Sequence, residues 1–322
     1  MNGQGRTGAD GTGADGTGAD GTGADGARLD EEERLEALRT ELCRIGPVVV
    51  AFSGGADSAF VAWMATRTLG ADQVLCVTAV SPSLAPEELA DCRALAGEWG
   101  LRHREVHTTE LADLSYSAND GMRCYHCKSS LMDALGPLAA SEQDGRGSVV
   151  VLGVNLDDLG DHRPGQQAAA ERGARFPLVA AGFTKAEVRA SSRQLGLRTW
   201  DKPAAACLAS RVPYGTPVTL GTLRSVAEAE SGLRALGFRQ LRVRHYGDTA
   251  RIEVPPGDLA SVVSNRSDVV QAVHRAGYRY VTLDLEGFRS GNLNDALSPD
   301  GALPVDGALP VGVLATASGG SQ

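Results

Sequence analysis

Apolar residues follow two different spacings along the chain, one typical of helices and one typical of buried strands. Leucine and isoleucine recur at helical spacing over residues 30–45 and predict a helix. The continuous apolar run 48–52 comes next and is typical of a strand buried on both faces. The alternation continues and predicts helices over 58–69, 86–99 and 123–138 and strands over 73–77, 102–106 and 149–152. Strands that alternate with helices predict an α/β fold built on a doubly wound parallel sheet.

A smaller α+β unit is predicted after about residue 216. Its elements are a helix over 219–236, a hairpin of strands 241–245 and 250–254, a helix over 267–276 and a strand over 280–283. The stretch 199–217 between the units is rich in proline, alanine and small polar residues, and ligand sites favour such junctions. We therefore expect a first domain over 30–205 and a second, substrate-handling domain over 206–297.

Both ends of the chain are repetitive. Residues 7–26 repeat Thr-Gly-Ala-Asp-Gly, and residues 300–311 contain Asp-Gly-Ala-Leu-Pro-Val twice. The first repeat has almost no large apolar side chain, so we predict disordered tails over 1–29 and 298–322. A calcium-binding glycine/aspartate roll is the alternative for the first repeat, but such a roll needs apolar residues to stack.

Charge and composition exclude several classes of protein. Residues 1–33 hold eight acidic residues against two arginines, so the rest of the chain carries only about −3 of the net charge of −9. The nearly neutral body gives no electrostatic footprint for nucleic acid. No apolar run is long enough for a membrane-spanning helix, and the N-terminus does not resemble a secretory signal. Six cysteines are too few for a disulfide framework, so we expect a reducing cytoplasm.

Residues 53–58 read Ser-Gly-Gly-Ala-Asp-Ser, directly after the first buried strand and at the start of a helix. Backbone N–H groups of a glycine turn at a helix N-terminus bind anions, although an ordinary strand–helix turn is the alternative interpretation. The segment resembles the Ser-Gly-Gly-x-Asp-Ser signature of the PP-loop ATP pyrophosphatases, which cleave ATP between the α- and β-phosphates. The resemblance implies that ATP is bound by Ser53, Gly54, Gly55, Asp57 and Ser58.

Two further segments are similar to the same superfamily. Residues 152–158 follow the fourth strand at the carboxyl edge of the sheet, where their acidic side chains either hold Mg²⁺ or cap a turn. Residues 183–188 resemble the superfamily's Thr-Lys segment, although a solvated first-turn lysine is the alternative. The resemblance implies that Asn155, Asp158 and Lys185 also bind ATP, with Mg²⁺ as its ion.

Residues 200–217 carry the most specific match. Together with the ATP loop they resemble the LarE family, the ATP-dependent sacrificial sulfur transferases of nickel-pincer nucleotide synthesis. The similarity runs from about residue 30 to 296 and includes the segments 123–128, 160–165, 242–245, 250–254 and 287–291. The resemblance implies that Cys207 gives up its sulfur. It also implies substrate binding by Ser210, Arg211, Arg242 and Arg244, and binding of a divalent ion by Glu230 and Glu253.

The chemistry explains why an ATP loop and a thiol belong together. Adenylation turns a carboxylate into an electrophile with AMP as leaving group, and a thiolate then attacks the carbonyl. Elimination across the cysteine Cα–Cβ bond leaves a thioacid product and dehydroalanine in the chain. By family resemblance the substrate is pyridinium-3,5-biscarboxylic acid mononucleotide. A buried, inert side chain is the alternative for Cys207.

The arginines near the proposed sulfur donor have their own alternatives. Arg242 and Arg244 alternate on one strand, so both face the same side and suit a phosphate, but a solvated strand face is equally compatible. Arg211, four residues after Cys207, could lower the thiol pKa or bind a phosphate. Without the resemblance Glu230 and Glu253 would be taken for surface residues, and a third carboxylate at Asp258 is an insecure match.

Three other functions remain open on the sequence. Cys124 and Cys127 form a Cys-x-x-Cys pair that, with Cys207, resembles the ligands of iron–sulfur PP-loop enzymes that thiolate tRNA. The others are a glutamine-fed PP-loop amidotransferase or synthetase, for which no glutaminase segment is apparent, and a non-catalytic nucleotide-binding module. The expected partner is a small nucleotide substrate rather than nucleic acid or a membrane. A homo-oligomer and contacts with other proteins of nickel-pincer cofactor synthesis are compatible with the sequence.

Overall fold

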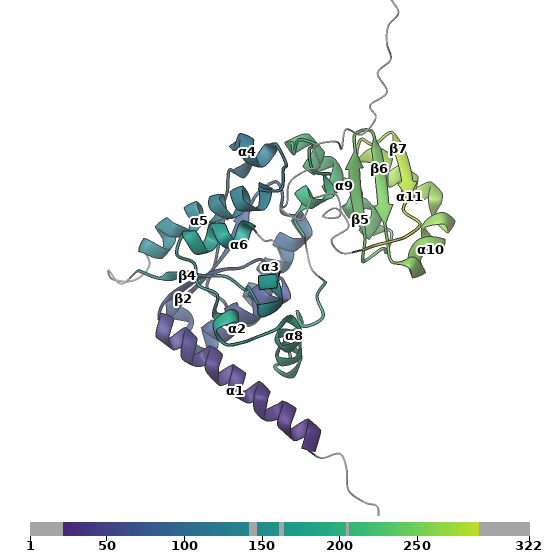
Figure 1. The fold of residues 1–322 in the computed structure, drawn as a ribbon. Helices are drawn as coiled ribbons and strands as arrows, with labels where there is room; N and C mark the ends of the chain where they lie inside the picture. The colour runs from purple at the N-terminus through teal and green to yellow at the C-terminus, as the bar shows by residue number, and fades with distance from the viewer. Residues whose placement is uncertain (1–21, 142–146, 161–163, 204–205, 290–322) are drawn as a thin grey trace, which may run out of the picture.

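The computed structural model describes residues 22–141, 147–160, 164–203 and 206–289. Its first unit is a four-stranded sheet in the order β3-β2-β1-β4, and all neighbouring strands are parallel. The strands are β1 (Val48–Ala51), β2 (Val74–Val80), β3 (His103–His107) and β4 (Val149–Val151). The predicted doubly wound α/β sheet is therefore confirmed, and Figure 1 shows it beside the smaller second unit.

The helices of the first unit connect and cover these strands. They are α1 (Thr22–Ile45), α2 (Ala56–Leu69), α3 (Pro86–Trp99), α4 (Leu114–Ser117), α5 (Arg123–Ser141), α6 (Pro164–Glu171), α7 (Pro177–Ala180) and α8 (Lys185–Gln194). Short 3₁₀ turns are η1 (Ala71–Gln73), η2 (Glu110–Ala112), η3 (Leu156–Gly160) and η4 (Leu208–Arg211). Every helix and strand predicted between residues 30 and 152 is present, with ends that differ by a few residues.

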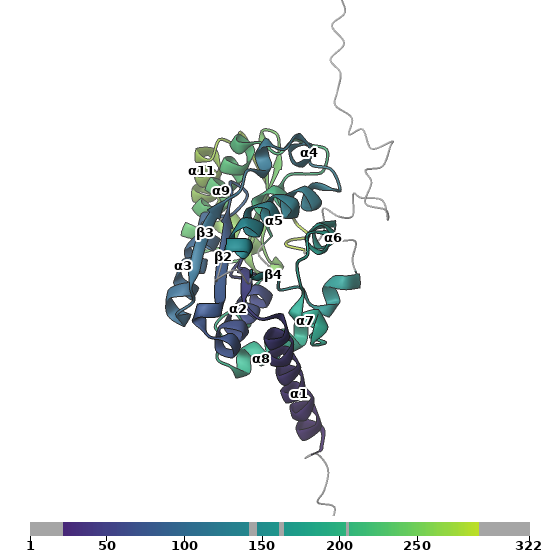
Figure 2. The same cartoon turned by 90° about the vertical axis from the view of Figure 1, so that its left-hand side faces the viewer.

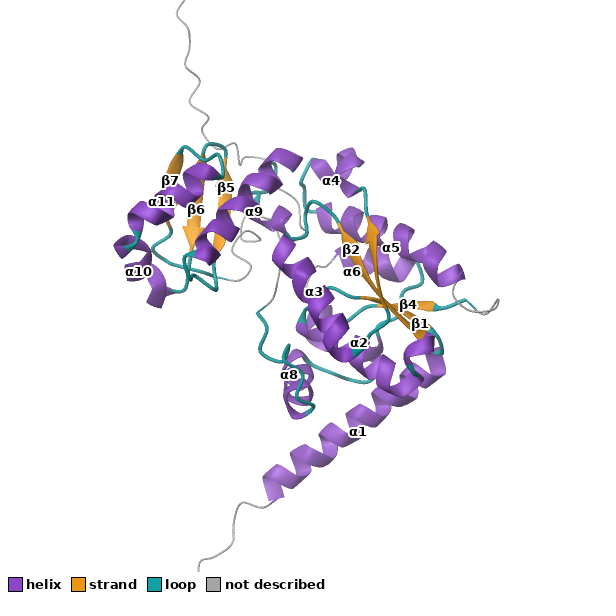
Figure 3. Ribbon diagram, turned by 180° about the vertical axis from the view of Figure 1, so that it is seen from behind, coloured by secondary structure: helices purple, strands orange, loops and turns teal. Residues whose placement is uncertain are grey.

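Apolar packing on both faces of the sheet explains the continuous valine run of β1. Val48 and Val50 pack with Leu38 of α1 and with residues of α2, α3 and α8 on one face. Val49 packs with Leu135 of α5 on the other face. A strand covered on both sides has no polar face, so its side chains do not alternate in polarity. Figures 2 and 3 show α5 and α6 on the opposite side of the strands from α2.

The second unit is a small sheet with one apolar and one polar face. Its elements are α9 (Leu220–Ala235), β5 (Arg242–Tyr246), β6 (Thr249–Glu253), the turn η5 (Pro256–Asp258), α10 (Leu259–Ser264), α11 (Arg266–Arg275) and β7 (Tyr280–Leu283). Strands β5 and β6 form the predicted antiparallel hairpin, and β7 pairs in parallel with β6. Val243 and Ile252 pack against α9 and α11, so the alternate residues form the opposite, polar face.

The boundary between the units is less simple along the chain than the expected limits 30–205 and 206–297. Tyr116 of the first unit is fully buried in the apolar core of the second, and Leu111 and Cys127 pack against that core. The segment from η2 to the start of α5 therefore contributes to both units. Those domain limits remain a prediction.

The N-terminal helix is longer than expected. Helix α1 begins at Thr22, inside the predicted disordered tail 1–29, and its N-terminal end projects from the body in Figure 1. Once the turns over 30–45 are fixed by packing, each further helical residue adds one hydrogen bond without a new nucleation step. Residues 1–21 and the predicted tail 298–322 lie outside the described residues. Across the described ranges, no helix has the length and apolar character required to span a membrane.

We expect Gly153→Ala to lower the free energy of unfolding by about 1–3 kcal/mol. A methyl group at Gly153, just after β4, would lie 2.6 Å from the backbone nitrogen of Ser58 at the start of α2. Gly97→Ala in α3 is the matched control, because nothing lies within 4 Å of its added methyl. That change should instead raise the unfolding free energy by about 0.5–1 kcal/mol. Urea unfolding of both variants measures the difference, and equal stability of Gly153→Ala and the wild type would contradict this close approach.

Candidate active site

The loop between β1 and α2 is shaped by its glycines. Gly54 has φ 67°, a left-handed conformation that favours glycine, and a Cβ there would lie 2.9 Å from Sγ of Cys92. Ser58 Oγ accepts a hydrogen bond from the Ser53 N–H at 3.2 Å and donates to the Gly55 carbonyl at 3.2 Å. These contacts close the loop at the N-terminus of α2, where unsatisfied N–H groups favour an anion.

Asp57 is the point at which three predicted ATP-binding segments meet. Its carboxylate accepts a hydrogen bond from Asn155 Nδ2 at 3.2 Å and lies 3.9 Å from Nζ of Lys185. Burial raises the pKa of Asp57, the nearby carboxylate of Asp158 raises it too, and Lys185 and Asn155 lower it. The structure thus brings Asp57, Asn155, Asp158 and Lys185 together at the carboxyl edge of the sheet.

The acidic residues after β4 both accept hydrogen bonds from backbone N–H groups. Asp157 accepts a hydrogen bond from the backbone N–H of Lys185 at 2.7 Å, so it caps the start of α8. Asn155 Oδ1 accepts from the backbone N–H groups of Asp157 at 3.0 Å and Asp158 at 3.3 Å and orders the turn. Asp158 Oδ2 accepts a hydrogen bond from the Asn155 N–H at 3.2 Å, and the Asp158 carboxylate is also close enough to Asp57 to raise the pKa of Asp57.

Lys202 is a loop contact that the sequence reasoning missed. Its Nζ donates to the Gly54 carbonyl at 3.1 Å and forms ion pairs with Asp91 at 2.6 Å and Glu88 at 2.8 Å. Burial lowers the pKa of Lys202, but the two carboxylates of α3 raise it on balance. The contact ties the loop to the segment that leads to Cys207. The sequence offered one indication of this contact, which is the place of Lys202 inside the matched segment 200–217.

Cys207 is exposed, which overturns the alternative of a buried, inert side chain. The residues after it are held from three directions. The Leu208 N–H donates to the Ser83 carbonyl at 2.8 Å, in the loop after β2. Arg123 of α5 donates to the Ala209 carbonyl at 3.0 Å, and Arg244 of β5 donates to the Ser210 carbonyl at 2.8 Å. The thiol therefore lies where the two units meet.

Arg211 is directed at the backbone around Cys207. Its Nε and Nη2 pair with Glu230 at 2.8 and 3.2 Å. Its Nη1 donates to the carbonyls of Ala206 at 2.6 Å and Cys207 at 3.1 Å. Arg211 thus pairs with a carboxylate and holds the main chain at Cys207, and its binding of substrate remains a prediction.

Arg242 and Arg244 lie on the polar face of the second sheet, and both are buried. Arg244 pairs with Glu253 at 3.0 Å. Arg242 lies over the ring of Phe288 at 4.7 Å, and no carboxylate among the described residues forms an ion pair with it. Burial and the neighbouring cations Arg211 and Arg244 lower the pKa of Arg242 to about 10. The alternative of a solvated strand face is therefore wrong for both residues.

The predicted metal ligands Glu230 and Glu253 are fully buried rather than on the surface. Both oxygens of Glu230 accept hydrogen bonds, from Arg211, from Arg234 at 2.8 Å and from the Val243 N–H at 3.1 Å. In this arrangement Glu230 does not fit a divalent cation, because arginine and backbone N–H groups occupy both of its oxygens. The metal role of Glu253 and Asp258 remains a prediction.

The remaining cysteines of the Cys-x-x-Cys pair lie near Cys207. Cys124 is exposed in the first turn of α5, and Cys127 packs against the second core with Leu208 and Ala209. Burial raises the pKa of the Cys127 thiol to about 12. Within the described ranges, no three His, Cys, Asp or Glu side chains are grouped so that they could hold a metal ion.

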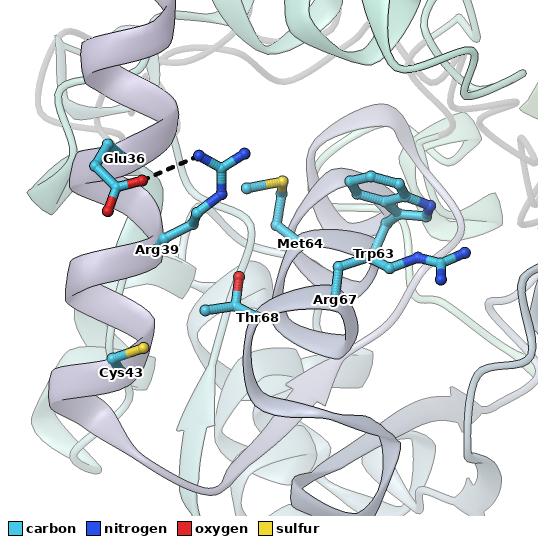
Figure 4. A pocket seen from close by; sticks show the side chains of 7 residues that line it. All are labelled: Glu36, Arg39, Cys43, Trp63, Met64, Arg67 and Thr68. Carbon is cyan, nitrogen blue, oxygen red and sulfur yellow. Dashed lines mark hydrogen bonds and ion pairs between the residues drawn. The ribbon is translucent and has the colours of Figure 1, made fainter.

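A cavity of about 550 Å³ lies apart from these residues, between α1 and α2. Figure 4 shows Glu36, Arg39 and Cys43 of α1 facing Trp63, Met64, Arg67 and Thr68 of α2 across it. The α2 residues belong to the end of the helix opposite the ATP loop. The candidate active site is therefore the sheet edge and the junction.

The matches to known proteins are of two kinds: some cover a minority of the chain, and others cover most of it. Residues 34–127 match the family model described as NAD synthase. An NH₃-dependent NAD⁺ synthetase of Chlorobium phaeobacteroides is 34% identical over 95 residues, 29% of this chain and 34% of that protein. The family-model match ends at residue 127, before Cys207 and the second sheet.

Other relatives match most of the chain and therefore both units. A protein of Synechocystis with no described function is 48% identical over 269 residues, 83% of this chain and 99% of that protein. The pyridinium-3,5-bisthiocarboxylic acid mononucleotide synthase of Lactiplantibacillus plantarum is 40% identical over 252 residues, 78% of this chain and 90% of that protein. The chain therefore belongs to the LarE family, enzymes built on the PP-loop ATP pyrophosphatase fold.

Proposed function

We propose that this enzyme is an ATP-dependent sulfur transferase that adenylates a substrate carboxylate and then transfers sulfur from its own Cys207. The substrate is pyridinium-3,5-biscarboxylic acid mononucleotide, and the products are a thiocarboxylic acid, AMP, pyrophosphate and a chain with dehydroalanine at position 207. The printed name of the Lactiplantibacillus plantarum relative supports the substrate class. The observation that carries the proposal is Arg242, a buried cation without a carboxylate partner among the described residues, close to the segment after Cys207.

The first step takes place at the loop. The N-terminus of α2 and Lys185 favour the phosphates of ATP, so the substrate carboxylate attacks the α-phosphorus and pyrophosphate leaves. Mg²⁺ bound to ATP would neutralise phosphate charge, and the carboxylates of Asp57 and Asp158 would supply oxygen donors that this ion prefers, while Asn155 holds Asp57 in place through Nδ2. The product is an acyl adenylate at the carboxyl edge of the sheet.

The second step uses the thiol at the junction. The Cys207 thiolate attacks the acyl carbonyl and AMP leaves, which gives a thioester to the protein. Loss of the Cα proton and cleavage of the Cβ–S bond release the thiocarboxylate and leave dehydroalanine. Arg211 holds the main chain at Ala206 and Cys207, and Arg244 holds the Ser210 carbonyl, while Arg242 binds the substrate phosphate.

The biological setting is part of the same proposal. The product would feed nickel-pincer nucleotide synthesis, whose other proteins are the expected partners, and that cofactor serves lactate racemisation. All six cysteines are free thiols, which is compatible with a reducing cytoplasm. A homo-oligomeric state remains open to measurement.

We expect Asp57→Asn to reduce pyrophosphate release about a hundredfold, because it removes a charged oxygen ligand at the phosphates. The chain should remain as stable as the wild type or become more stable. Burial raises the pKa of Asp57, so its ionised form opposes folding at neutral pH. Assays of pyrophosphate and AMP together with thermal unfolding test both effects. Asp133→Asn, on an exposed position of α5, is the control. Formation of ADP and phosphate by the wild type would contradict the loop's role.

We expect Arg242→Met to raise the substrate KM ten- to a hundredfold, the loss of about 1.5–3 kcal/mol of charge-assisted binding, with little change in the KM for ATP. Because the unpaired charge opposes folding, the same variant should gain about 1–3 kcal/mol of unfolding free energy. The exposed Arg224→Met on α9 is the control and should change neither quantity. If Arg242→Met is less stable than the wild type and keeps a normal substrate KM, this arginine has a structural role and does not bind the substrate phosphate.

We expect one sulfur transferred per chain, with a loss of about 34 Da as the cysteine becomes dehydroalanine. Cys207→Ser should still release pyrophosphate, because adenylation precedes thiol attack, but should form no thioacid. Cys124→Ser and Cys127→Ser should still transfer sulfur. Intact-mass measurement and iron analysis after anaerobic purification distinguish a sacrificed Cys207 from an iron–sulfur cluster. Stoichiometric iron, several turnovers with added sulfide and no mass loss would favour the iron–sulfur alternative.

A further inference from the structure

The side chain of Lys202 joins the ATP loop to helix α3. Its Nζ donates to the Gly54 carbonyl at 3.1 Å and lies 2.6 Å from Asp91 and 2.8 Å from Glu88 of α3. The side chain is only 16% exposed. The main chain of the same residue is held separately, because Arg189 of α8 donates to the Lys202 carbonyl at 2.8 Å. Lys202 is thus fixed by two helices, with its amino group on the loop.

The group that Lys202 holds is the peptide between Gly54 and Gly55, which has a glycine on each side. Turning this peptide over changes ψ of Gly54 and φ of Gly55, and glycine accepts either sign of φ. Gly55 has φ −74°, and the turned-over peptide would give it a positive φ. Two neighbouring glycines therefore allow both orientations, so a contact from outside the loop can decide between them.

The orientation of this peptide decides which atom the loop offers to a ligand. In a trans peptide the C=O and N–H groups point in opposite directions. With the Gly54 carbonyl on Lys202, the Gly55 N–H points away from Lys202, and within the described residues it donates to no backbone acceptor. It precedes the first turn of α2, where N–H groups favour an anion. A turned-over peptide would present its oxygen there instead and would repel a phosphate.

We propose that Lys202 is a positioning residue that holds the Gly54–Gly55 peptide with its N–H directed at the β- and γ-phosphates of ATP. This inference rests on the proposed function, because that function assigns the pyrophosphate end of ATP to the loop. AMP lacks these two phosphates. Loss of the contact should therefore weaken the binding of ATP more than the binding of AMP.

The test compares two dissociation constants, measured by isothermal titration calorimetry with Mg²⁺ and without carboxylate substrate. The probes are AMP and α,β-methylene-ATP, which cannot be cleaved between the α- and β-phosphates. Lys202→Met keeps the length of the side chain but removes the donor. We expect its affinity for the ATP analogue to fall about tenfold and its affinity for AMP to stay within about twofold of the wild type.

Two further variants separate the contact from the charge. Arg198→Met also removes a positive charge that pairs with Asp91, at 2.8 Å, but leaves the contact to Gly54 in place. We expect it to bind the ATP analogue within about twofold of the wild type. The double variant Lys202→Met with Asp91→Asn restores the local charge balance but not the donor, so it should keep the tenfold loss of Lys202→Met.

Three results would overturn the inference. The first is an unchanged affinity of Lys202→Met for the ATP analogue, and the second is equal weakening of the analogue and AMP. The third is recovery of the affinity in the double variant, which would assign the effect to charge alone. If Lys202→Met does not fold, the charge-balanced double variant answers the same question. A wild type that does not bind the analogue would instead count against the proposed function.

Discussion

The buried ion pair between Arg211 and Glu230 holds the junction on which the rest of the site depends. One edge of the guanidinium binds the carboxylate, and Nη1 binds the carbonyls of Ala206 and Cys207. Loss of Glu230 would leave the buried charge of Arg211 without its carboxylate, which commonly destabilises by about 3–5 kcal/mol. The pair therefore keeps the main chain of an exposed cysteine in one place while its side chain remains accessible.

Around this pair, the unmatched positive charge is concentrated at two points. Arg242 lies on the polar sheet face beside Phe288, and Arg123 lies under the segment that follows Cys207. Both are buried and form no ion pair with a carboxylate among the described residues. Burial and the neighbouring cations Arg211 and Arg244 make the charge of Arg242 unfavourable until an anion compensates it. For the function we propose, that anion is the substrate phosphate.

The two units come together at the carboxyl edge of the parallel sheet. The ATP loop follows β1, Ser83 follows β2 and Asn155 follows β4. Ser83 accepts a hydrogen bond from the residue after Cys207, and Asn155 donates one to Asp57 of α2. Lys202 links the same elements through the Gly54 carbonyl. A polar loop at such an edge can be changed without disturbing the apolar layers beneath, since Val49 and Val50 pack on helices of opposite faces.

The sequence alone determined the elements, because apolar periodicity follows directly from which faces a helix or strand must bury. It also indicated the loop at 53–58 and the thiol at 207, since both lie in continuous motifs. Only the tertiary structure decided the charge partners. Nothing in the local pattern shows that Glu230 and Glu253 are buried against Arg211 and Arg244, that Asp157 caps α8, or that Lys202 and Arg123 reach the site. Ion pairing and burial depend on residues far apart in the chain, and the balance of charge in a low-dielectric interior exists only after those residues have come together.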